Sequence, residues 1–335
     1  MKAAQIKEAG SDFEIVDLPV PKPSAREVLI KIEACGICHS DAMVKDGLFP
    51  GIEYPRVPGH EVVGIIEETG SEISNWNKGD RVGVGWHGGH CFHCDACRRG
   101  DFVNCENAKV AGISYDGGYA EYMTAPVEAL ARVPEDLSSE EAAPLLCAGI
   151  TTFNALRNSG ARPGDLVAVQ GIGGLGHLAV QYAAKMGFKT VAISTSDDKR
   201  KLAEELGAHR FINAKKEDAV KVLQEIGGAK VVVATAPNTD IIGEIVGGLG
   251  LEGNLIVLAA TGETFEVSPF SLIMGRKKVS GWPSGTAKDS EDTLNFSAMT
   301  GTKPMIETFS LDQANEAYNH MINNKARFRT VLTMG

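Results

Sequence analysis

Apolar and polar positions follow two different patterns along the chain. Up to about residue 148, short β-branched runs such as Val28–Ile32 and Glu61–Ile66 are separated by clusters of proline and glycine. Many short strands separated by turns predict a partly closed β-barrel. From about Arg162, apolar strands alternate with helical patterns, which predicts βαβ units around a parallel sheet.

The first strand and helix of the second region have the clearest boundaries. Leu166–Gln170 predicts a buried strand, a glycine-rich turn follows, and a helix is expected to run to Met186. Thr190–Ser194 is the next expected strand. The later expected elements are helices at Lys199–Leu206, Asp240–Leu249, Asp289–Met299 and Leu311–Ile322, and strands at Val231–Ala234, Asn254–Leu258 and Ala326–Leu332.

A capping box predicts a short helix near the end of the first region. Ser138 is expected as its N-cap with Glu141 three residues later, and Pro144 should disturb the helix just before Cys147. The expected fold class is α/β, with a β-barrel domain at 1–148 and a doubly wound parallel-sheet domain at 149–284. Residues 285–335 are expected to return to the first domain.

Length and charge narrow the possible functions. At 335 residues the chain exceeds what one hydrophobic core usually serves, and its net charge of −10 argues against a nucleic-acid partner. No apolar run approaches the ~20 residues of a spanning helix, and Met1–Ile6 shows no apolar signal core. The seven cysteines cluster in a way that suggests metal ligands rather than disulfides, so we expect a cytoplasmic protein without a membrane partner.

Three scattered residues supply two thiolates and one imidazole. Cys38, His60 and Cys147 are a ligand set typical of a catalytic zinc whose fourth position is open. Asp41 is suited to accept the other ring N–H of His60 and so to orient it. Spacing alone does not prove this trio, because Cys38 or Cys147 taken singly fits a buried structural thiol better than a ligand, and it is the rest of the sequence that favours the metal site.

Four further cysteines lie close together in a polar, glycine-rich stretch at 86–108. Cys91, Cys94, Cys97 and Cys105 can form a closed tetrahedral shell, which leaves no position for a substrate and predicts a structural zinc. Three histidines flank this array and are expected to be bystanders, because four sulfurs already fill the shell. The sequence therefore predicts two zinc ions per chain.

A G-x-G-x-x-G turn lies between a predicted strand and a predicted helix, which is the context that a dinucleotide-binding site requires. Gly171 allows the tight turn, Gly173 lets the backbone approach a pyrophosphate, and Gly176 packs the helix on the strand. Gly174 and Leu175 complete the turn, and the helix N-terminus would face the phosphates.

The end of the second strand of this domain determines which cofactor is expected. An acidic residue there would bind the ribose 2′-OH of NAD and repel a 2′-phosphate. The chain instead has the hydroxyls of Ser194, Thr195 and Ser196, followed by the two cations of Lys199–Arg200. These residues favour NADP, whereas Asp197–Asp198 favour NAD unless their side chains point to solvent, so NAD remains the alternative.

The trio, the cysteine lobe and the glycine-rich turn occur in an order that resembles the zinc-dependent medium-chain alcohol dehydrogenases over nearly the whole chain. The motifs that carry the resemblance are Gly36–Asp41, Gly59–Glu61, Cys91–Cys105, Pro144–Gly149 and Gly171–Gly176. The resemblance implies a GroES-like catalytic domain, a Rossmann domain, an active site in the cleft between them, and homodimers or homotetramers. Ser194 resembles the NADP-using, cinnamyl-alcohol-dehydrogenase-like branch.

The resemblance also implies roles for individual residues. Ser40 would take the proton of the alcohol, and Glu61 would approach the metal transiently. His39 and Arg329 would contact the cofactor pyrophosphate, although Arg329 fits a solvated charge on an edge strand equally well. Trp86 would form an aromatic wall of the substrate pocket, with an ordinary core tryptophan as the alternative.

One residue departs from the family pattern. Met43 stands where many relatives have a histidine that ends the proton relay, so the relay must end at Ser40, a cofactor ribose hydroxyl or water. The expected reaction interconverts a small primary alcohol and its aldehyde with NADP(H). The alternatives are a zinc-free quinone or enoyl reductase, a polyol dehydrogenase, whose relatives usually have glutamate in place of Cys147, and a zinc-binding scaffold without catalysis.

Overall fold

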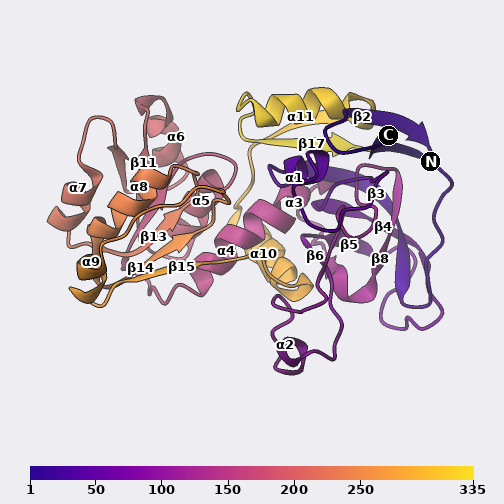
Figure 1. The fold of residues 1–335 in the computed structure, drawn as a ribbon, viewed down its shortest axis with the longest axis horizontal. Coiled ribbons are helices and arrows are strands. Elements are labelled where there is room, and N and C mark those ends of the chain that lie inside the picture. The colour runs from indigo at the N-terminus through magenta and orange to yellow at the C-terminus, as the bar shows by residue number, and fades with distance from the viewer. The chain divides into compact units, whose positions relative to one another are not determined.

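The computed structural model describes residues 1–335, which divide into two compact units. Unit 1 consists of Met1–Ile150 and Ser284–Gly335, and unit 2 consists of Thr151–Pro283. Figure 1 labels the elements of both units along the chain. No helix in the structure is long and apolar enough to cross a bilayer.

Unit 1 is built mainly from β-strands, together with five α-helices. Its strands are β1 (Lys2–Ile6), β2 (Phe13–Asp17), β3 (Glu27–Ile37), β4 (Val62–Thr69), β5 (Arg81–Val84), β6 (His87–Gly89), β7 (Lys109–Val110), β8 (Tyr122–Pro126), β9 (Leu130–Arg132), β16 (Ile306–Ser310) and β17 (Arg329–Thr333). Its helices are α1 (Asp41–Lys45), α2 (Asp95–Arg98), α3 (Ser139–Pro144), α10 (Ala287–Thr300) and α11 (Ala314–Ile322).

The long strand β3 organises unit 1. Seven strands form one sheet in the order β16-β17-β3-β4-β5-β9, with β8 paired to the first half of β3. Because β3 and β4 are antiparallel, with Cys35 opposite Val62, the segment after β3 and the segment before β4 lie at the same end of the sheet. Strand β17 pairs antiparallel with β3 on its other side, which brings the start of β17, at Arg329, to that end as well.

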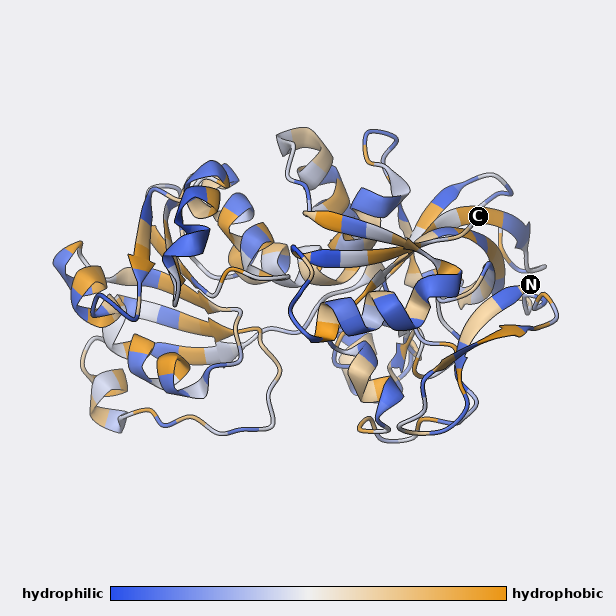
Figure 2. Cartoon of the chain, turned by 90° about the horizontal axis from the view of Figure 1, so that it is seen from above, coloured by the Kyte–Doolittle hydropathy of each residue, from blue (hydrophilic) through white to orange (hydrophobic).

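The core of unit 1 joins the sheet to the C-terminal helix. On α11, Ala314, Ala317, Tyr318 and Met321 are buried at helical spacing and belong to the same apolar cluster as the strands. Figure 1 shows α11 beside β17, and Figure 2 shows the blue and orange bands that such amphipathic helices carry. This packing explains why the last 50 or so residues return to the first unit.

Unit 2 is a parallel sheet with connecting helices. Its strands are β10 (Leu166–Gln170), β11 (Lys189–Ser194), β12 (Arg210–Asn213), β13 (Ala229–Ala234), β14 (Leu249–Val257) and β15 (Lys278–Gly281). Its helices are α5 (Gly176–Lys185), α6 (Arg200–Glu205), α7 (Ala219–Glu225), α8 (Thr239–Glu244) and α9 (Pro269–Ile273), and α4 (Ile150–Arg157) leads into it. The strand order β12-β11-β10-β13-β14-β15 reverses after β10, which is the doubly wound order of a Rossmann domain.

The structure confirms the predicted fold class and corrects several element boundaries. The expected helix at Asp240–Leu249 ends its α-helical part at Glu244 and continues as a 3-10 turn. The last strand begins at Arg329 rather than Ala326, and it lies between β16 and β3. Arg329 is therefore not a residue of an edge strand, and its side chain is buried.

Candidate active site and cofactor-binding loop

The three residues of the predicted catalytic zinc site meet at one end of the unit 1 sheet. Cys38 follows β3, His60 precedes β4, and Cys147 lies in the π-helical segment Leu145–Gly149 after α3. Their ligand atoms, with a carboxylate oxygen of Glu61, all lie within 4.8 Å of one another. These three residues were predicted as zinc ligands from their residue types, and the fold brings them together from three separate segments.

The distances fit a zinc ion. The Sγ atoms of Cys38 and Cys147 are 3.8 Å apart. Two thiolates bound tetrahedrally at a Zn–S distance of about 2.3 Å would be separated by about 3.8 Å. The Nε2 atom of His60 is buried and has no partner within the protein, as expected for an imidazole nitrogen that faces a metal. These three side chains can therefore hold a zinc ion.

Asp41 orients this site from the start of helix α1. Its Oδ1 atom lies 3.2 Å from Nδ1 of His60, while Oδ2 accepts hydrogen bonds from the Cys38 backbone N–H and the Tyr119 hydroxyl, each at 2.8 Å. Burial alone would lower the pKa of His60, but the Asp41 carboxylate and the Cys38 sulfur together outweigh it and raise that pKa well above its ordinary value. The contribution of Tyr119 could not be inferred from the sequence, because it lies 78 residues from Asp41.

The other residues expected around the trio occupy different positions. The Oγ atom of Ser40 lies 3.7 Å from Cys38 Sγ, and the half-buried Trp86 meets His60 edge to face at a centroid distance of 5.0 Å. His39 is exposed to solvent, and Met43 is half-buried in α1. Ser40 and Trp86 are therefore close to the ligand trio.

Glu61 and Arg329 form a buried ion pair beside the trio. Burial raises the pKa of Glu61 to about 7, against the opposing effect of the Arg329 guanidinium. One N–H group of Arg329 donates to Glu61, and its Nε atom has no partner in the protein. Gly36 is required beside this pair, because a Cβ at Gly36 would lie 1.9 Å from Glu61 Oε2.

The four cysteines of the predicted structural site also converge. Cys105 Sγ lies 3.6 Å from Cys91 Sγ and 3.9 Å from Cys94 Sγ, again close to the spacing of a zinc tetrathiolate. Backbone N–H groups of Cys94 and Cys97 donate to sulfur atoms of the same cluster at 3.4 and 3.5 Å. Figure 1 shows this lobe, with α2 at its tip, extending from the rest of unit 1.

The flanking histidines do not join this cluster. His87 Nε2 contacts His90 Nδ1 at 2.9 Å, and the ring of His90 stacks on Phe102 at 4.2 Å. His93 is exposed. The expectation that these histidines are bystanders agrees with their positions, because none of them belongs to the set of convergent ligand atoms.

The glycine-rich turn of unit 2 has the shape that a pyrophosphate requires. Gly171 adopts φ +92°, and a Cβ at Gly176 would lie 1.9 Å from the Gly171 carbonyl oxygen. A Cβ at Gly173 would meet no atom within 4 Å, so this glycine leaves open space in front of the loop. Leu175 precedes α5, which begins at Gly176. The hydroxyl of Thr235, directly after β13, donates to the backbone carbonyls of Gln170 and Gly171 at the start of the loop. The residues fit a dinucleotide.

The end of β11 carries the residues expected to select the cofactor. Ser194 is largely buried, Thr195 is exposed, and Ser196 Oγ donates to Asp198 at 2.8 Å. Lys199 donates from Nζ to the carbonyl of Ile172 at 2.7 Å, which connects this segment to the glycine-rich turn. The nearby Asp197 accepts hydrogen bonds from Lys216 and Arg200.

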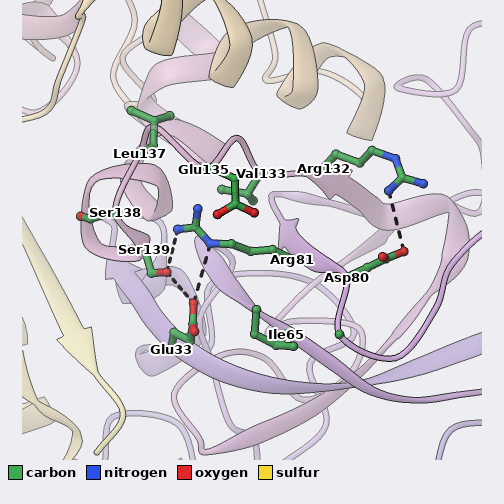
Figure 3. Close-up of a pocket in the computed structure, with 11 residues that line it drawn as sticks. Glu33, Ile65, Asp80, Arg81, Arg132, Val133, Glu135, Leu137, Ser138 and Ser139 are labelled. Atoms are coloured by element: carbon green, nitrogen blue, oxygen red, sulfur yellow. Dashed lines mark hydrogen bonds and ion pairs between the residues drawn. The ribbon is translucent and has the colours of Figure 1, made fainter.

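A hollow elsewhere on unit 1 is not the predicted site. Figure 3 shows this pocket, in which Arg81 donates to Ser139 Oγ at 2.9 Å. Arg81 also donates to the Pro134 carbonyl at 2.8 Å. Ser139 in turn donates to Glu33 at 2.6 Å, and none of the predicted site residues lines the hollow. These contacts fasten the start of α3 to β3 and β5, and so support the segment that delivers Cys147.

A Rossmann sheet together with a two-cysteine, one-histidine cluster defines the class of zinc-dependent dehydrogenases. Residues 24–135 match the family described as alcohol dehydrogenase GroES-like domain, and residues 174–299 match the family described as zinc-binding dehydrogenase. Both matches confirm the resemblance inferred from the motifs.

Individual relatives agree with this class. The chain is 44% identical to the alcohol dehydrogenase patD of Penicillium expansum over 333 residues, covering 99% of this chain and 97% of that one. It is 40% identical to an alcohol dehydrogenase of Geobacillus stearothermophilus, covering 100% and 99%. The structure of CAD from Helicobacter pylori complexed with NADP(H) superimposes with a TM-score of 0.87 at 29% identity, covering 99% and 97%. The chain belongs to the zinc-binding alcohol dehydrogenase family and is an oxidoreductase.

Proposed function

We propose that this enzyme interconverts small primary alcohols and aldehydes by hydride transfer to or from NADP(H). The observation that carries the proposal is the convergence of Cys38, His60 and Cys147, whose ligand atoms lie within 4.8 Å of one another. A zinc-free reductase would not need this trio, and a non-catalytic scaffold would not need it together with the glycine-rich turn.

The protein residues have separate tasks in this reaction. Cys38, His60 and Cys147 would hold a zinc ion, which when bound polarises the substrate oxygen and lowers the pKa of an alcohol. Ser40 accepts the alcohol proton at Oγ, since this hydroxyl lies beside the ligand Cys38. Because Met43 cannot carry a proton, the proton passes from Ser40 to water or to a cofactor hydroxyl. Trp86 contacts His60 and bounds the space next to it.

The cofactor assignment depends on Ser194. A carboxylate in this place would bind the ribose 2′-OH and repel a 2′-phosphate, and the chain has a hydroxyl. The Helicobacter pylori protein, which was solved with NADP(H), supports the same preference. Lys199 adds a cation between the end of β11 and the glycine-rich turn.

Cofactor preference is tested with Ser194→Asp. We expect the ratio of kcat/KM for NADP to that for NAD to fall by at least about tenfold, because a carboxylate repels the 2′-phosphate and accepts a ribose hydroxyl. Ser74→Asp, at an exposed loop position of unit 1, adds the same charge away from the turn and should leave the ratio unchanged. An unmoved ratio in Ser194→Asp would contradict the assignment.

Metal content is tested by elemental analysis. We propose two zinc ions per chain, one in each cluster of convergent ligands. Cys38→Ser should reduce the content to one ion and abolish alcohol-dependent cofactor reduction, with the fold retained. Hydride transfer that survives this substitution would rule out the metal-dependent reaction.

We further propose that the chain assembles as a homodimer, or a tetramer built from such dimers, through the open edge of the unit 2 sheet. β15 is the last strand of that sheet, and all four of its residues are exposed. Nearby Phe270 and Ile273 of α9 are 70% and 71% exposed. A second copy can pair with this edge about a twofold axis and cover the apolar side chains.

The assembly is tested by light scattering after size-exclusion chromatography. Phe270→Asp with Ile273→Asp should yield a smaller species, because two charges would face each other across the twofold axis. Met299→Asp, at a 75% exposed apolar position on α10, should leave the assembly intact. A double variant with the wild-type mass would exclude this edge as the interface.

A further inference from the structure

Two neighbouring strands of unit 2 end side by side. β11 and β12 run parallel, and Ser194 is opposite Asn213 at their ends. The segments that follow, 195–200 and 214–217, therefore emerge next to each other at the edge where a Rossmann domain binds the adenosine ribose. Nothing in the sequence alone indicated that the segment 214–217 takes part in cofactor selection.

Asp197 is the point where these segments meet. Its Oδ2 atom accepts from Lys216 Nζ at 2.6 Å, and its Oδ1 atom accepts from Arg200 at 3.1 Å. The hydrogen bonds from Lys216 and Arg200 help to lower the pKa of Asp197 to about 2. Asp197 is thus ionised, and its charge is matched by two cations.

The surroundings show which of these cations is most easily separated from Asp197. The guanidinium of Arg200 lies over the ring of Phe211 at 4.6 Å, so it is held by packing as well as by charge. The side chain of Lys216 is 71% exposed and has its ion pair with Asp197 as its contact. Lys216 is therefore the residue whose loss would expose the Asp197 charge with the least change in structure.

We propose that Lys216 is a specificity-determining residue for NADP(H), because it neutralises the Asp197 carboxylate that would otherwise repel the adenosine 2′-phosphate. The inference rests on the proposed use of NADP. A carboxylate at the end of the second strand is the feature that selects NAD in this fold. Asp197 could take that role three residues after Ser194, and its ion pair with Lys216 prevents it from doing so.

The expected effect appears in binding of cofactor fragments. The measure is the affinity of the intact, zinc-loaded enzyme for adenosine 2′,5′-bisphosphate divided by its affinity for AMP, determined by isothermal titration calorimetry. Lys216→Ala should lower this ratio by about three- to tenfold, the size expected when one unit charge acts on a phosphate across solvent. Lys201→Ala should leave it unchanged, since this 90% exposed lysine pairs with Glu205.

A double-mutant cycle distinguishes neutralisation from direct contact. In an Asp197→Asn background there is no carboxylate to neutralise, so Lys216→Ala should change the ratio by less than about twofold. An unchanged ratio in Lys216→Ala alone would overturn the inference. A full effect in the Asp197→Asn background would overturn it too, because Lys216 would then act on the phosphate itself.

The same data separate this inference from the cofactor assignment. A wild-type ratio at or below one would contradict the use of NADP. The change of the ratio on Lys216→Ala is measured from any starting value, so it tests the role of Lys216 independently of that result.

Discussion

Burial is too small to order the cysteine lobe, so its stability would depend on the structural zinc that we propose for it. Its apolar cluster contains Cys94, Cys97 and Cys105, with only Cys91, Ala96 and Phe102 packed against them. Ordering a 15-residue segment costs on the order of 15 kcal/mol of backbone entropy or more. Burial of one phenylalanine returns about 2 kcal/mol, whereas a structural zinc contributes roughly 10–16 kcal/mol. Only the free energy contributed by a zinc ion is large enough to offset the entropy cost of ordering this segment.

Cys94→Ser removes one ligand from this site. We expect the zinc content to fall by one ion per chain and the lobe at 91–105 to lose its structure. The backbone N–H of Cys97 donates to Cys94 Sγ at 3.5 Å. A serine hydroxyl can still accept this hydrogen bond, but without the zinc the lobe should lose its order, so this N–H should exchange rapidly with solvent. Hydrogen exchange followed by mass spectrometry measures this, with β3 and β4 as regions that should stay protected.

Cys35→Ala is the matched control, because Cys35 is fully buried and lies outside both clusters of ligands. It should keep both zinc ions and normal protection of the lobe. The reasoning is refuted if Cys94→Ser retains two zinc ions with unchanged exchange in 91–105. A variant that keeps its lobe folded but loses turnover would instead give the lobe a direct catalytic role.

Three further predictions concern the two sites and their surroundings. Asp41→Asn should weaken zinc binding at His60 by about 10–100-fold, measured by competition with a chelator, because the ring loses its charged partner. Gly176→Ala should reduce binding of both NAD and NADP by more than about tenfold in fluorescence titrations at unchanged zinc content, since its Cβ would meet the Gly171 carbonyl. Burial lowers the pKa of His87 to about 4, so the unfolded state alone takes up a proton as the pH falls from about 6.5. His87 should therefore lower the free energy of unfolding by about 2 kcal/mol between pH 7 and pH 5. In urea unfolding, His87→Gln should show a correspondingly smaller loss of stability over the same pH range.

Local patterns in the sequence were sufficient for elements with strong periodicity. β10 coincides with the predicted strand Leu166–Gln170 because four of its five residues are buried, and α3 begins at the predicted capping box. The short strand β12 was not predicted, since its four residues (Arg210–Asn213) give too short a pattern to identify. The edge strand β15 was also missed, because all four of its residues are exposed and it lacks an apolar face.

The candidate metal ligands could be proposed from residue type, but the pairings around them depend on topology. Glu61 and Arg329 are 268 residues apart and meet because β17 is inserted beside β3 in the sheet. Asp197 and Lys216 meet because β12 pairs with β11. In both cases the charge seen in the sequence has a partner that local spacing cannot identify. The side chain that looked available for a cofactor phosphate, Arg329, is bound to a carboxylate, and the carboxylate that seemed to disfavour NADP, Asp197, is bound to cations. Cofactor preference is therefore better predicted from the charges that remain after such pairs have formed.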